Sequence, residues 1–424
     1  MDLIKRQIKA FRGNARARQS LNLLVTNIVG IPLGVIISII LTKNLGAEGF
    51  GSYSFIVSIF TLSVLITTFG FYQAGNRALV LNHNKARARQ LYGAELVLTL
   101  LMFVLMTICL ALYAALDPNL KSKGLTTTFS YVLPLGFVFL ATKFTETLFQ
   151  ADNRIGLLAT YRLLTKVVYV SVLLTIWLTD FSVQGRILLT VLYGYFFSQL
   201  VVFLFIVVFL KPSFRFLSSR LKLLWLYNRS FGLNIYIGSL FAVGFTSLSQ
   251  ILIGYFSESN SGVGFYTLAL TFSAPLALIP NTIATVHYKD FSKYNRIPRK
   301  LLFYTLAITV AALLSLWVII APFVRFFYGD DFMTVVNLNY IVSLGVLVHG
   351  LSDFYNRFLG ANGQSIALRN SSFVVGGGAM IVGIALIPLY GAYGAALTKL
   401  VVGVIYLGII LWYYMNYTKQ GYEK

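Results

Sequence analysis

Charged residues inside long apolar stretches are the part of this sequence with the most evident chemistry. Arg162 and Lys166 are four residues apart, so on a helix they share one face. Lys143 and Glu146 are three apart in the preceding apolar stretch and also share a face. The short turn QADNR at 150–154 joins the two stretches, which predicts that they run antiparallel as neighbours. We therefore expect the four side chains to cluster.

A cluster of three basic side chains and one acidic side chain could hold an anion in a polar cavity. If the stretch crosses a membrane, a rise of about 1.5 Å per residue puts Lys166 roughly 16 Å from Ile155, where its ammonium group reaches water poorly. Charged side chains at such depth face a cavity or the interior of a helix bundle. The alternative for Arg162 and Lys166 is an ion pair packed between helices. Lys143 and Glu146 could instead neutralise each other.

Three more charged residues interrupt apolar stretches in the second half of the chain. Asp353 and Arg357 are four apart, where either a surface ion pair or a gate with a proton-coupled carboxylate fits the spacing. Lys399 is alone in the last stretch, and it either lines the cavity or extends its ammonium group to the membrane surface. We assign Lys143, Arg162, Lys166 and Lys399 to a substrate-binding cavity, and Glu146, Asp353 and Arg357 to a gate or to proton coupling.

Signals for enzyme chemistry and for metal binding are absent from the sequence. It contains no HExxH, GxxxxGK[ST] or GxSxG motif, and its single cysteine, Cys109, can form no intrachain disulfide. The histidines lack a partner at metal-ligand spacing and are scattered at His83, His287 and His349. Glu95 lies close to Arg87 and Arg89, and we expect it to pair with them at the membrane surface. We predict no catalytic residue, no metal and no cofactor.

The stretches that position these residues have the length and composition of membrane spans. Of 424 residues, 58% are hydrophobic and 11% are charged, against about 25% charged in a typical soluble domain. A helix needs about 20 apolar residues to cross a bilayer. Twelve such runs are predicted, at 21–42, 51–74, 91–115, 129–150, 155–179, 187–210, 231–256, 263–287, 301–327, 334–356, 366–388 and 392–416. The expected fold is therefore all-α and polytopic.

The placement of lysine and arginine predicts the orientation in the membrane. With the N-terminus in the cytoplasm, the outer segments hold only Lys43, Lys121, Lys123, Arg186 and Arg325, and most other basic residues lie on the inner side. An even number of spans returns the C-terminus to the cytoplasm. The net charge of +21 thus lies mainly in short segments at the membrane surface, and we expect no binding to nucleic acid.

The chain also repeats itself about its midpoint. NLGAEGFGSYSF at 44–55 and SESNSGVGFYTL at 257–268 match at one constant offset, which pairs Gly49 with Gly262, Gly51 with Gly264 and Tyr53 with Tyr266. We predict two six-helix bundles, 1–212 and 213–424, related by a pseudo-two-fold axis along the membrane normal. The glycine-rich stretch would be an outer hairpin turn, used once in each half. The alternative is that any two membrane hairpins look alike.

Three segments resemble a known family. LGAEGFGSYSF at 45–55 resembles the first hairpin of polysaccharide flippases of the Wzx type, which belong to the superfamily of multidrug and toxin extruders and peptidoglycan lipid flippases. FFYGDDFMTVVNLNYI at 326–341 resembles their connection between the ninth and tenth spans. GANGQSIALRN at 360–370, followed by LIPLYGAYGAALTKLV at 386–401, resembles their last two spans. These motifs are structural, so they indicate the superfamily better than the substrate.

The resemblance implies a fold and a function. Two six-helix bundles would face each other across a central cavity that opens alternately to either side of the bacterial inner membrane. The cargo would be an oligosaccharide repeat unit on a polyprenyl diphosphate, as in the synthesis of O-antigen lipopolysaccharide or capsule. A glycan polymerase and its chain-length machinery are the candidate protein partners.

Two other functions fit some of these features. An exporter of drugs or cations from the same superfamily would need an acidic or neutral lumen, whereas the deep charges here are mainly basic. A membrane glycan polymerase would need a sizeable outer loop, and no predicted outer gap is long enough to supply one. We therefore expect a transporter and not an enzyme.

Overall fold

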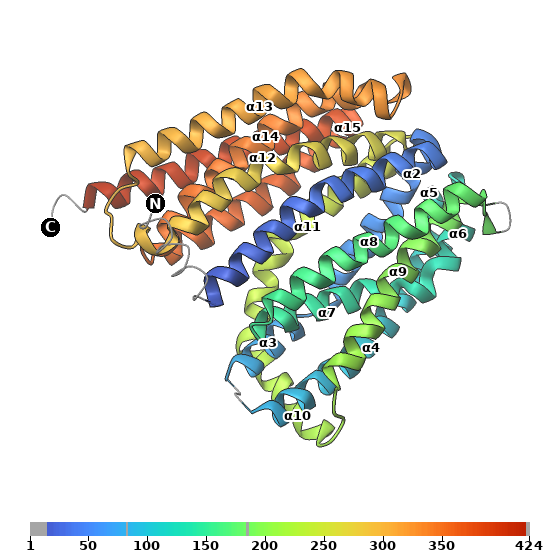
Figure 1. The fold of residues 1–424 in the computed structure, drawn as a ribbon, viewed down its shortest axis with the longest axis horizontal. Coiled ribbons are helices and arrows are strands. Elements are labelled where there is room, and N and C mark those ends of the chain that lie inside the picture. Colours follow the sequence, from blue (N-terminus) through green and yellow to red (C-terminus); the bar gives the residue numbers. More distant parts are fainter. Residues whose placement is uncertain (1–14, 82–83, 184–185, 421–424) are drawn as a thin grey trace, which may run out of the picture. The chain divides into compact units, whose positions relative to one another are not determined.

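The computed structural model describes residues 15–81, 84–183 and 186–420, and every regular element within these ranges is a helix (Figure 1). The predicted all-α fold class is confirmed. Contacts divide the chain into two compact units, of which the first joins residues up to Asn44 with Ser63–Ile237, and the second joins Leu45–Leu62 with Gly238–Lys424. The predicted bundles 1–212 and 213–424 are halves of the sequence, and that division stays a prediction. Contacts group the chain differently because 45–62 pack with the second half and 213–237 with the first.

The first unit is a helical bundle. It contains the first arm of α2 (Ala15–Thr67) and then α3 (Phe71–Leu81), α4 (Lys85–Leu116), α5 (Pro118–Ser122), α6 (Thr126–Val132), α7 (Phe137–Ala151), α8 (Ile155–Thr179), α9 (Ile187–Leu210) and α10 (Leu217–Tyr227). A 3₁₀ turn at Leu133–Gly136 separates α6 from α7, because Pro134 has no N–H group for an α-helical bond. Between α7 and α8 the chain reverses at Asn153, whose φ is 53°.

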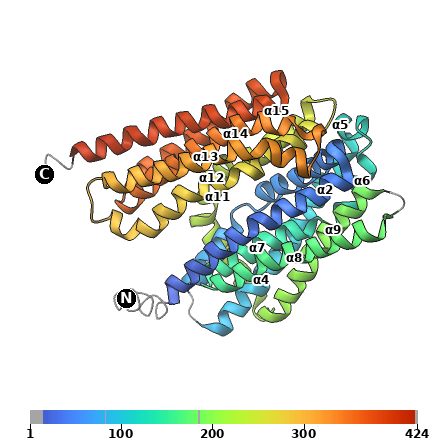
Figure 2. The ribbon, with the colours of Figure 1, turned by 45° about the horizontal axis from the view of Figure 1, so that its top comes forward.

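The second unit contains most of α11 (Leu233–Phe256), followed by α12 (Ser261–Phe291), α13 (Arg299–Phe327), α14 (Thr334–Ala361) and α15 (Ser365–Gln420). Helix α14 packs beside α12 and α15, and α13 packs against α12 and α14 (Figure 2). Near the C-terminal ends of α12 and α14 the core is aromatic. There the ring of Phe291 lies 5.7 Å from that of Phe354 and 5.4 Å from that of Phe358.

The outward faces of several helices are strongly apolar. Helix α4 exposes Leu101 by 60% and Leu112 by 58%, and α13 exposes Val318 by 76% and Phe326 by 81%. Soluble monomers rarely expose continuous apolar faces of this kind, whereas helices in contact with lipid do so along their length. The exposed faces therefore fit a chain whose helices are surrounded by hydrocarbon.

Nine helices of the described residues are long and apolar enough to cross a membrane. Two of them, α2 and α15, are each broken by a glycine with positive φ, 64° at Gly46 and 55° at Gly391. Glycine adopts this conformation readily, whereas other residues rarely do. Because the conformation is not helical, each long helix consists of two arms joined by a sharp turn. Helix α11 is also apolar, but several of its side chains lie outside the described set. The count of twelve spans stays a prediction.

The two glycine-rich hairpins of the sequence repeat pack directly against each other within the second unit. A β-carbon on Gly51 would stand 1.8 Å from the carbonyl oxygen of Asn260, and one on Gly264 would stand 3.2 Å from the carbonyl oxygen of Ala47. The repeat pairs Gly51 with Gly264 and Ala47 with Asn260. The contact is therefore reciprocal, as in an interface with two-fold symmetry. This reciprocity supports the predicted duplication of the chain.

Polar contacts fix the same junction. Glu48 accepts a hydrogen bond from the backbone N–H of Asn260 over 3.0 Å and another from the hydroxyl of Ser259. The side-chain amide of Asn260 donates to the hydroxyl of Ser52 over 3.1 Å, and both residues are buried. The carboxylate of Glu48 in the first hairpin thus accepts from a backbone N–H group of the second hairpin.

We expect Gly51→Ala to destabilise the protein. The added methyl group must displace the backbone carbonyl of Asn260, and overpacking of this kind costs about 1–3 kcal/mol. The melting temperature of the purified protein in detergent measures the effect. Gly408→Ala is the control, because that helical position has nothing within 4 Å of a new β-carbon. Equal melting temperatures for the two variants would show that the hairpins do not approach so closely.

Candidate functional site

The hairpin of α7 and α8 brings two of the predicted residues together in the first unit. The Nε of Arg162 donates to the Oε1 of Glu146 over 2.8 Å, and both side chains are half-buried. The turn after α7 reverses the chain, so the last two turns of α7 lie level with the first half of α8. Hydroxyls of Thr142 and Tyr161 are 2.9 Å apart across the same hairpin. For Arg162 the structure thus shows the ion pair that the sequence left open as an alternative.

Lys166 lies one turn further along α8 and bonds to a backbone group. Its Nζ donates to the carbonyl oxygen of Gly30, in the first arm of α2, over 2.7 Å. The approach requires a small residue there, because a β-carbon on Gly30 would stand 3.2 Å from the Nζ. Lys166 is half-buried and forms no ion pair with a carboxylate among the described residues, and the charge of Arg162 repels its own. Within the described residues, the carbonyl of Gly30 is thus the acceptor that faces its positive charge.

Lys143 is exposed on α7 and takes part in no ion pair within the described part of the chain. The neutralisation of Lys143 by Glu146 that the spacing allowed does not occur, because Glu146 turns to Arg162 on the neighbouring helix. We call Lys143, Glu146, Arg162 and Lys166 the hairpin cluster. With three basic groups and one carboxylate, its net charge is positive.

A second polar network joins α12, α14 and α15 in the second unit. Asp353 accepts hydrogen bonds from the hydroxyl of Tyr406 over 3.0 Å and from the side-chain amide of Asn281 over 3.4 Å. The amide oxygen of Asn281 accepts in turn from the Nε of Arg357 over 3.3 Å. Lys399 is half-buried on α15 and interacts electrostatically with Asp353. Asp353, on α14, thus has partners on α12 and α15. We call Asp353, Tyr406, Asn281, Arg357 and Lys399, with the neighbouring His349, the Asp353 network.

The structure corrects the interpretation of this network in two ways. Asp353 and Arg357 do not pair directly as a surface ion pair, because Asn281 stands between them. His349, which looked isolated in the sequence, has its ring 5.0 Å from the ring of Tyr406 and interacts with Asp353. A spacing signal existed for His349, since positions 349, 353 and 357 share one helix face. Tyr406 gives no such signal, because tyrosine is common in this sequence.

Glu95 is a further correction. The expected surface pairing with Arg87 and Arg89 is wrong, because Glu95 is buried in α4 with only 2% of its surface exposed. Its Oε1 has no hydrogen-bond partner among the described residues. The carboxyl group lies against Gly75 of α3, where a β-carbon would stand 2.0 Å from that oxygen. The missing side chain of Gly75 therefore makes the room that Glu95 occupies.

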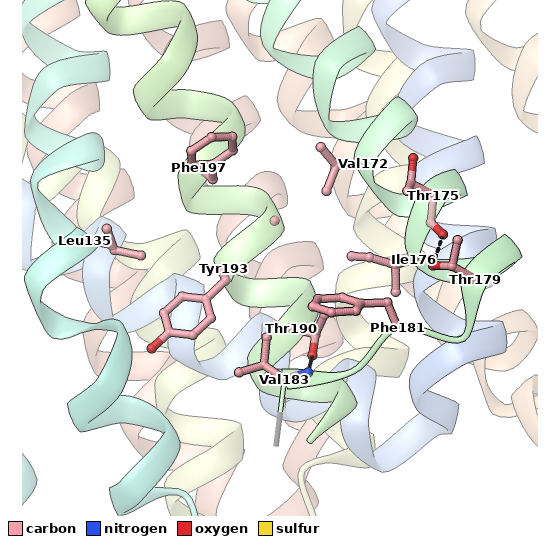
Figure 3. Close-up of a pocket in the computed structure, with 11 residues that line it drawn as sticks. Leu135, Val172, Thr175, Ile176, Thr179, Phe181, Val183, Thr190, Tyr193 and Phe197 are labelled. Atoms are coloured by element: carbon pink, nitrogen blue, oxygen red, sulfur yellow. Dashed lines mark hydrogen bonds between the residues drawn. The ribbon is translucent and has the colours of Figure 1, made fainter. Parts of the chain in front are cut away.

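An apolar groove of about 690 Å³ runs beside α8 and α9 (Figure 3). Val172, Ile176 and Phe197 line it. The threonine hydroxyls in its wall already have partners. Thr175 donates to the carbonyl of Ser171, Thr179 donates to that of Thr175, and Thr190 accepts from the N–H of Val183. With no charged residue in its lining, the groove suits a hydrocarbon chain and not a polar headgroup.

Neither cluster has the parts of a metal centre or a nucleophilic enzyme. Within the described ranges, no group of three or more histidine, cysteine, aspartate or glutamate residues could hold a metal ion. The hairpin cluster offers ammonium and guanidinium groups, which bind anions. The Asp353 network offers a carboxyl group, an imidazole and a phenol, which can hold or exchange a proton. Together these groups suit binding and ion exchange.

Comparison with known proteins places this geometry in context. The family described as polysaccharide biosynthesis proteins matches residues 17–295. A search of curated proteins finds no match. The solved structure of the lipid II flippase MurJ in an inward closed conformation is similar with a TM-score of 0.72 and 15% sequence identity, over 92% of this chain and 86% of that one.

Two transporters of related fold are similar as well. A multidrug resistance MATE family transporter of the MOP superfamily, in an inward-facing conformation, gives a TM-score of 0.66 at 12% identity over 94% of this chain and 99% of that one. The MATE multidrug transporter DinF-BH, in complex with R6G, gives 0.61 at 11% identity over 93% of each chain. At such low identities these likenesses show a shared fold.

We expect a double-mutant cycle on Glu146 and Arg162 to show coupling. Glu146→Gln should destabilise the protein by about 1–3 kcal/mol, because it leaves the half-buried guanidinium without its charged partner. Arg162→Gln in the same protein should recover part of that loss. Melting temperatures in detergent give the four corners of the cycle. Lys143→Gln is the control with little effect, because it removes a positive charge as Arg162→Gln does, but from an exposed side chain. Strictly additive losses would show that Glu146 and Arg162 do not interact.

Proposed function

Because the chain belongs to the family of polysaccharide biosynthesis proteins, we propose that it is a flippase for a lipid-linked oligosaccharide. It moves a repeat unit on a polyprenyl diphosphate from the inner to the outer leaflet by alternating access. The membrane is the bacterial cytoplasmic membrane, with both chain termini in the cytoplasm. A glycan polymerase and its chain-length machinery take over the product outside. The fold shared with flippases and transporters supports this proposal.

The observation that carries the proposal is the net positive charge of the hairpin cluster inside apolar helices. The diphosphate of the cargo is anionic, and it loses its hydration when it leaves the membrane surface. Lys166 can replace part of that hydration, because its ammonium group is held by a backbone carbonyl and not by a carboxylate. Arg162 adds a second positive group within the same hairpin, with Glu146 fixing its orientation. Lys143 and Lys399 are the other two residues that we assign to substrate binding.

The membrane potential contributes to the direction of transport. When the inside of the membrane is negative, outward movement of a negative diphosphate is favoured by about 2.3 kcal/mol per charge for each 100 mV. The Asp353 network supplies a second source of direction if its carboxyl group exchanges a proton during the cycle. Arg357 and Asn281 sit beside that carboxyl and can act as the gate that responds to its charge. Glu146 is the second candidate for proton exchange.

The charges also weigh against export of cationic drugs, the alternative that the MATE fold raises. A cationic cargo would meet repulsion at Lys166 and Arg162, since Glu146 balances only one of them. An assay of drug sensitivity in a deletion strain separates the two functions. Loss of drug resistance with normal surface glycan would favour the exporter.

We expect Lys166→Ala to abolish surface glycan in a strain that depends on this gene, while the protein still inserts in the membrane. The change removes a half-buried charge of the hairpin cluster that pairs with no carboxylate among the described residues. Lys300→Ala, which removes an exposed lysine at the start of α13, is the matched control and should leave the glycan unchanged. Immunoblots of membranes measure insertion, and glycan staining measures transport. Normal glycan with a well-expressed Lys166→Ala protein would contradict the role of this residue.

We expect Asp353→Asn to uncouple transport from the proton gradient. The amide keeps the shape of the carboxyl group and can still accept from Tyr406, but it cannot take up a proton. In vesicles with a purified lipid-linked oligosaccharide, a pH gradient should accelerate flipping by the wild type and not by Asp353→Asn. Thr285→Val, which removes a hydroxyl bonded only within α12, is the control. Equal acceleration of both proteins would remove Asp353 from the coupling mechanism.

A further inference from the structure

A basic pocket of about 810 Å³ lies in the first unit, and its lining shares no residue with the hairpin cluster. Its walls are the start of α4, the turn between α7 and α8, and the last residues of α9 with those that follow. Lys85, Arg89, Arg154 and Lys211 line it, and Asp152 is the one acidic residue in its lining. Because these segments are helix ends, the pocket lies at a membrane surface, on the side that the basic residues predict to be cytoplasmic.

Internal contacts leave much of this positive charge uncompensated. Asp152 is already engaged, because it accepts a hydrogen bond from the hydroxyl of Tyr92 over 2.8 Å and pairs with Arg154 over 2.5 Å. Arg89 donates to the backbone carbonyl of Lys211 over 2.7 Å, a neutral acceptor. Lys85 and Lys211 are exposed and form no ion pair with any residue that the structure describes. The pocket therefore carries net positive charge that no internal carboxylate balances.

The backbone adds to this positive field and fixes its shape. Helix α4 begins at Lys85 and α8 begins just after Arg154, so two long helices start at the wall of the pocket. Arg154 caps α8 without a side-chain hydrogen bond to its first N–H groups. Free N–H groups and the helix dipole favour an anion at the start of α8. At the start of α4, the side chain of Asn84 already accepts from the N–H of Ala86. A bond from the N–H of Ser213 to the carbonyl of Arg89, 2.8 Å, ties the end of α9 to α4.

Apolar side chains complete the lining and indicate what kind of anion fits. Val80 at the end of α3 and Phe209 at the end of α9 both line the pocket and are exposed by 50% and 54%. A soluble anion would make no apolar contact with these side chains, whereas the first carbons of a lipid chain would pack against them. Basic pockets between helices at the cytoplasmic surface suit phosphate headgroups.

We propose that this pocket binds the phosphate group of an anionic phospholipid from the inner leaflet. The phosphate contacts Lys85 and Lys211, and the acyl chains leave along Val80 and Phe209. The site is separate from the hairpin cluster, and the proposal does not depend on the transport function. Binding would add a further link between the ends of α4, α8 and α9, beside the side-chain bonds of Arg89 and Asp152 at this surface.

The test measures binding of short-chain lipids to the full-length protein in detergent. Dioctanoyl phosphatidylglycerol is the anionic probe, dioctanoyl phosphatidylcholine is the zwitterionic probe with the same chains, and pyrophosphate is the soluble probe. The variant Lys85→Gln/Lys211→Gln removes two charges whose side chains make no described contact. The matched control is Arg215→Gln/Lys222→Gln, which removes two exposed charges outside the pocket but on the same predicted side of the membrane.

We expect phosphatidylglycerol to bind about 30-fold more weakly to the pocket variant than to the wild type, the loss that two basic side chains at a membrane surface account for. The control variant should bind as the wild type does, and melting temperatures should show that both variants are folded. Equal loss in both variants would show that only the overall charge matters, which overturns the site. Phosphatidylcholine binding as tightly as phosphatidylglycerol would also overturn it. Pyrophosphate binding as tightly as the lipid would overturn the lipid assignment in favour of a soluble phosphate compound.

Discussion

Charges that lie inside apolar helices need partners, and much of this structure follows from that constraint. A charged side chain in the middle of a bilayer costs several kcal/mol unless another group compensates it. Arg162 finds Glu146 across a hairpin, and Lys166 finds the carbonyl of Gly30 on a helix far away in sequence. Asp353 finds neutral donors on two other helices. The contacts that keep the charges in place therefore also join the helices of each unit.

The quality of the compensation differs, and that difference separates structural from functional groups. Arg162 and Glu146 satisfy each other, so the pair mainly orients the hairpin. Lys166 bonds to a carbonyl and to no carboxylate that the structure describes, which in our proposal leaves its field available to an anion. The Asp353 carboxylate is surrounded by an amide and a phenol, so a change in its charge is felt on three helices. The flippase function that we propose would use both kinds of group, one to receive an anionic headgroup and another to change state during the cycle.

Glycine lets two backbone segments approach closely at the junction of the two repeats. Gly51 allows the first hairpin to reach the backbone of Asn260, and the corresponding Gly264 meets Ala47 in return. Reciprocal contacts of this kind arise naturally when a duplicated chain packs its two copies against each other. The consequence is that 45–62 belong by contact to the second unit although they precede most of the first. A segment from the first half of the sequence is thus part of the second unit.

The sequence alone determined the class of the protein, because composition and apolar run length report directly on solvation. It also determined which charged residues lie inside helices, and the antiparallel pairing that brings Glu146 to Arg162, since spacing and turn length are local properties. Tertiary structure decided the partners. Glu95 is buried against Gly75, Lys166 reaches Gly30, and Asn281 separates Asp353 from Arg357, because each depends on which helices pack together. Packing between distant segments leaves no local signal, so no pattern along the chain could have predicted it.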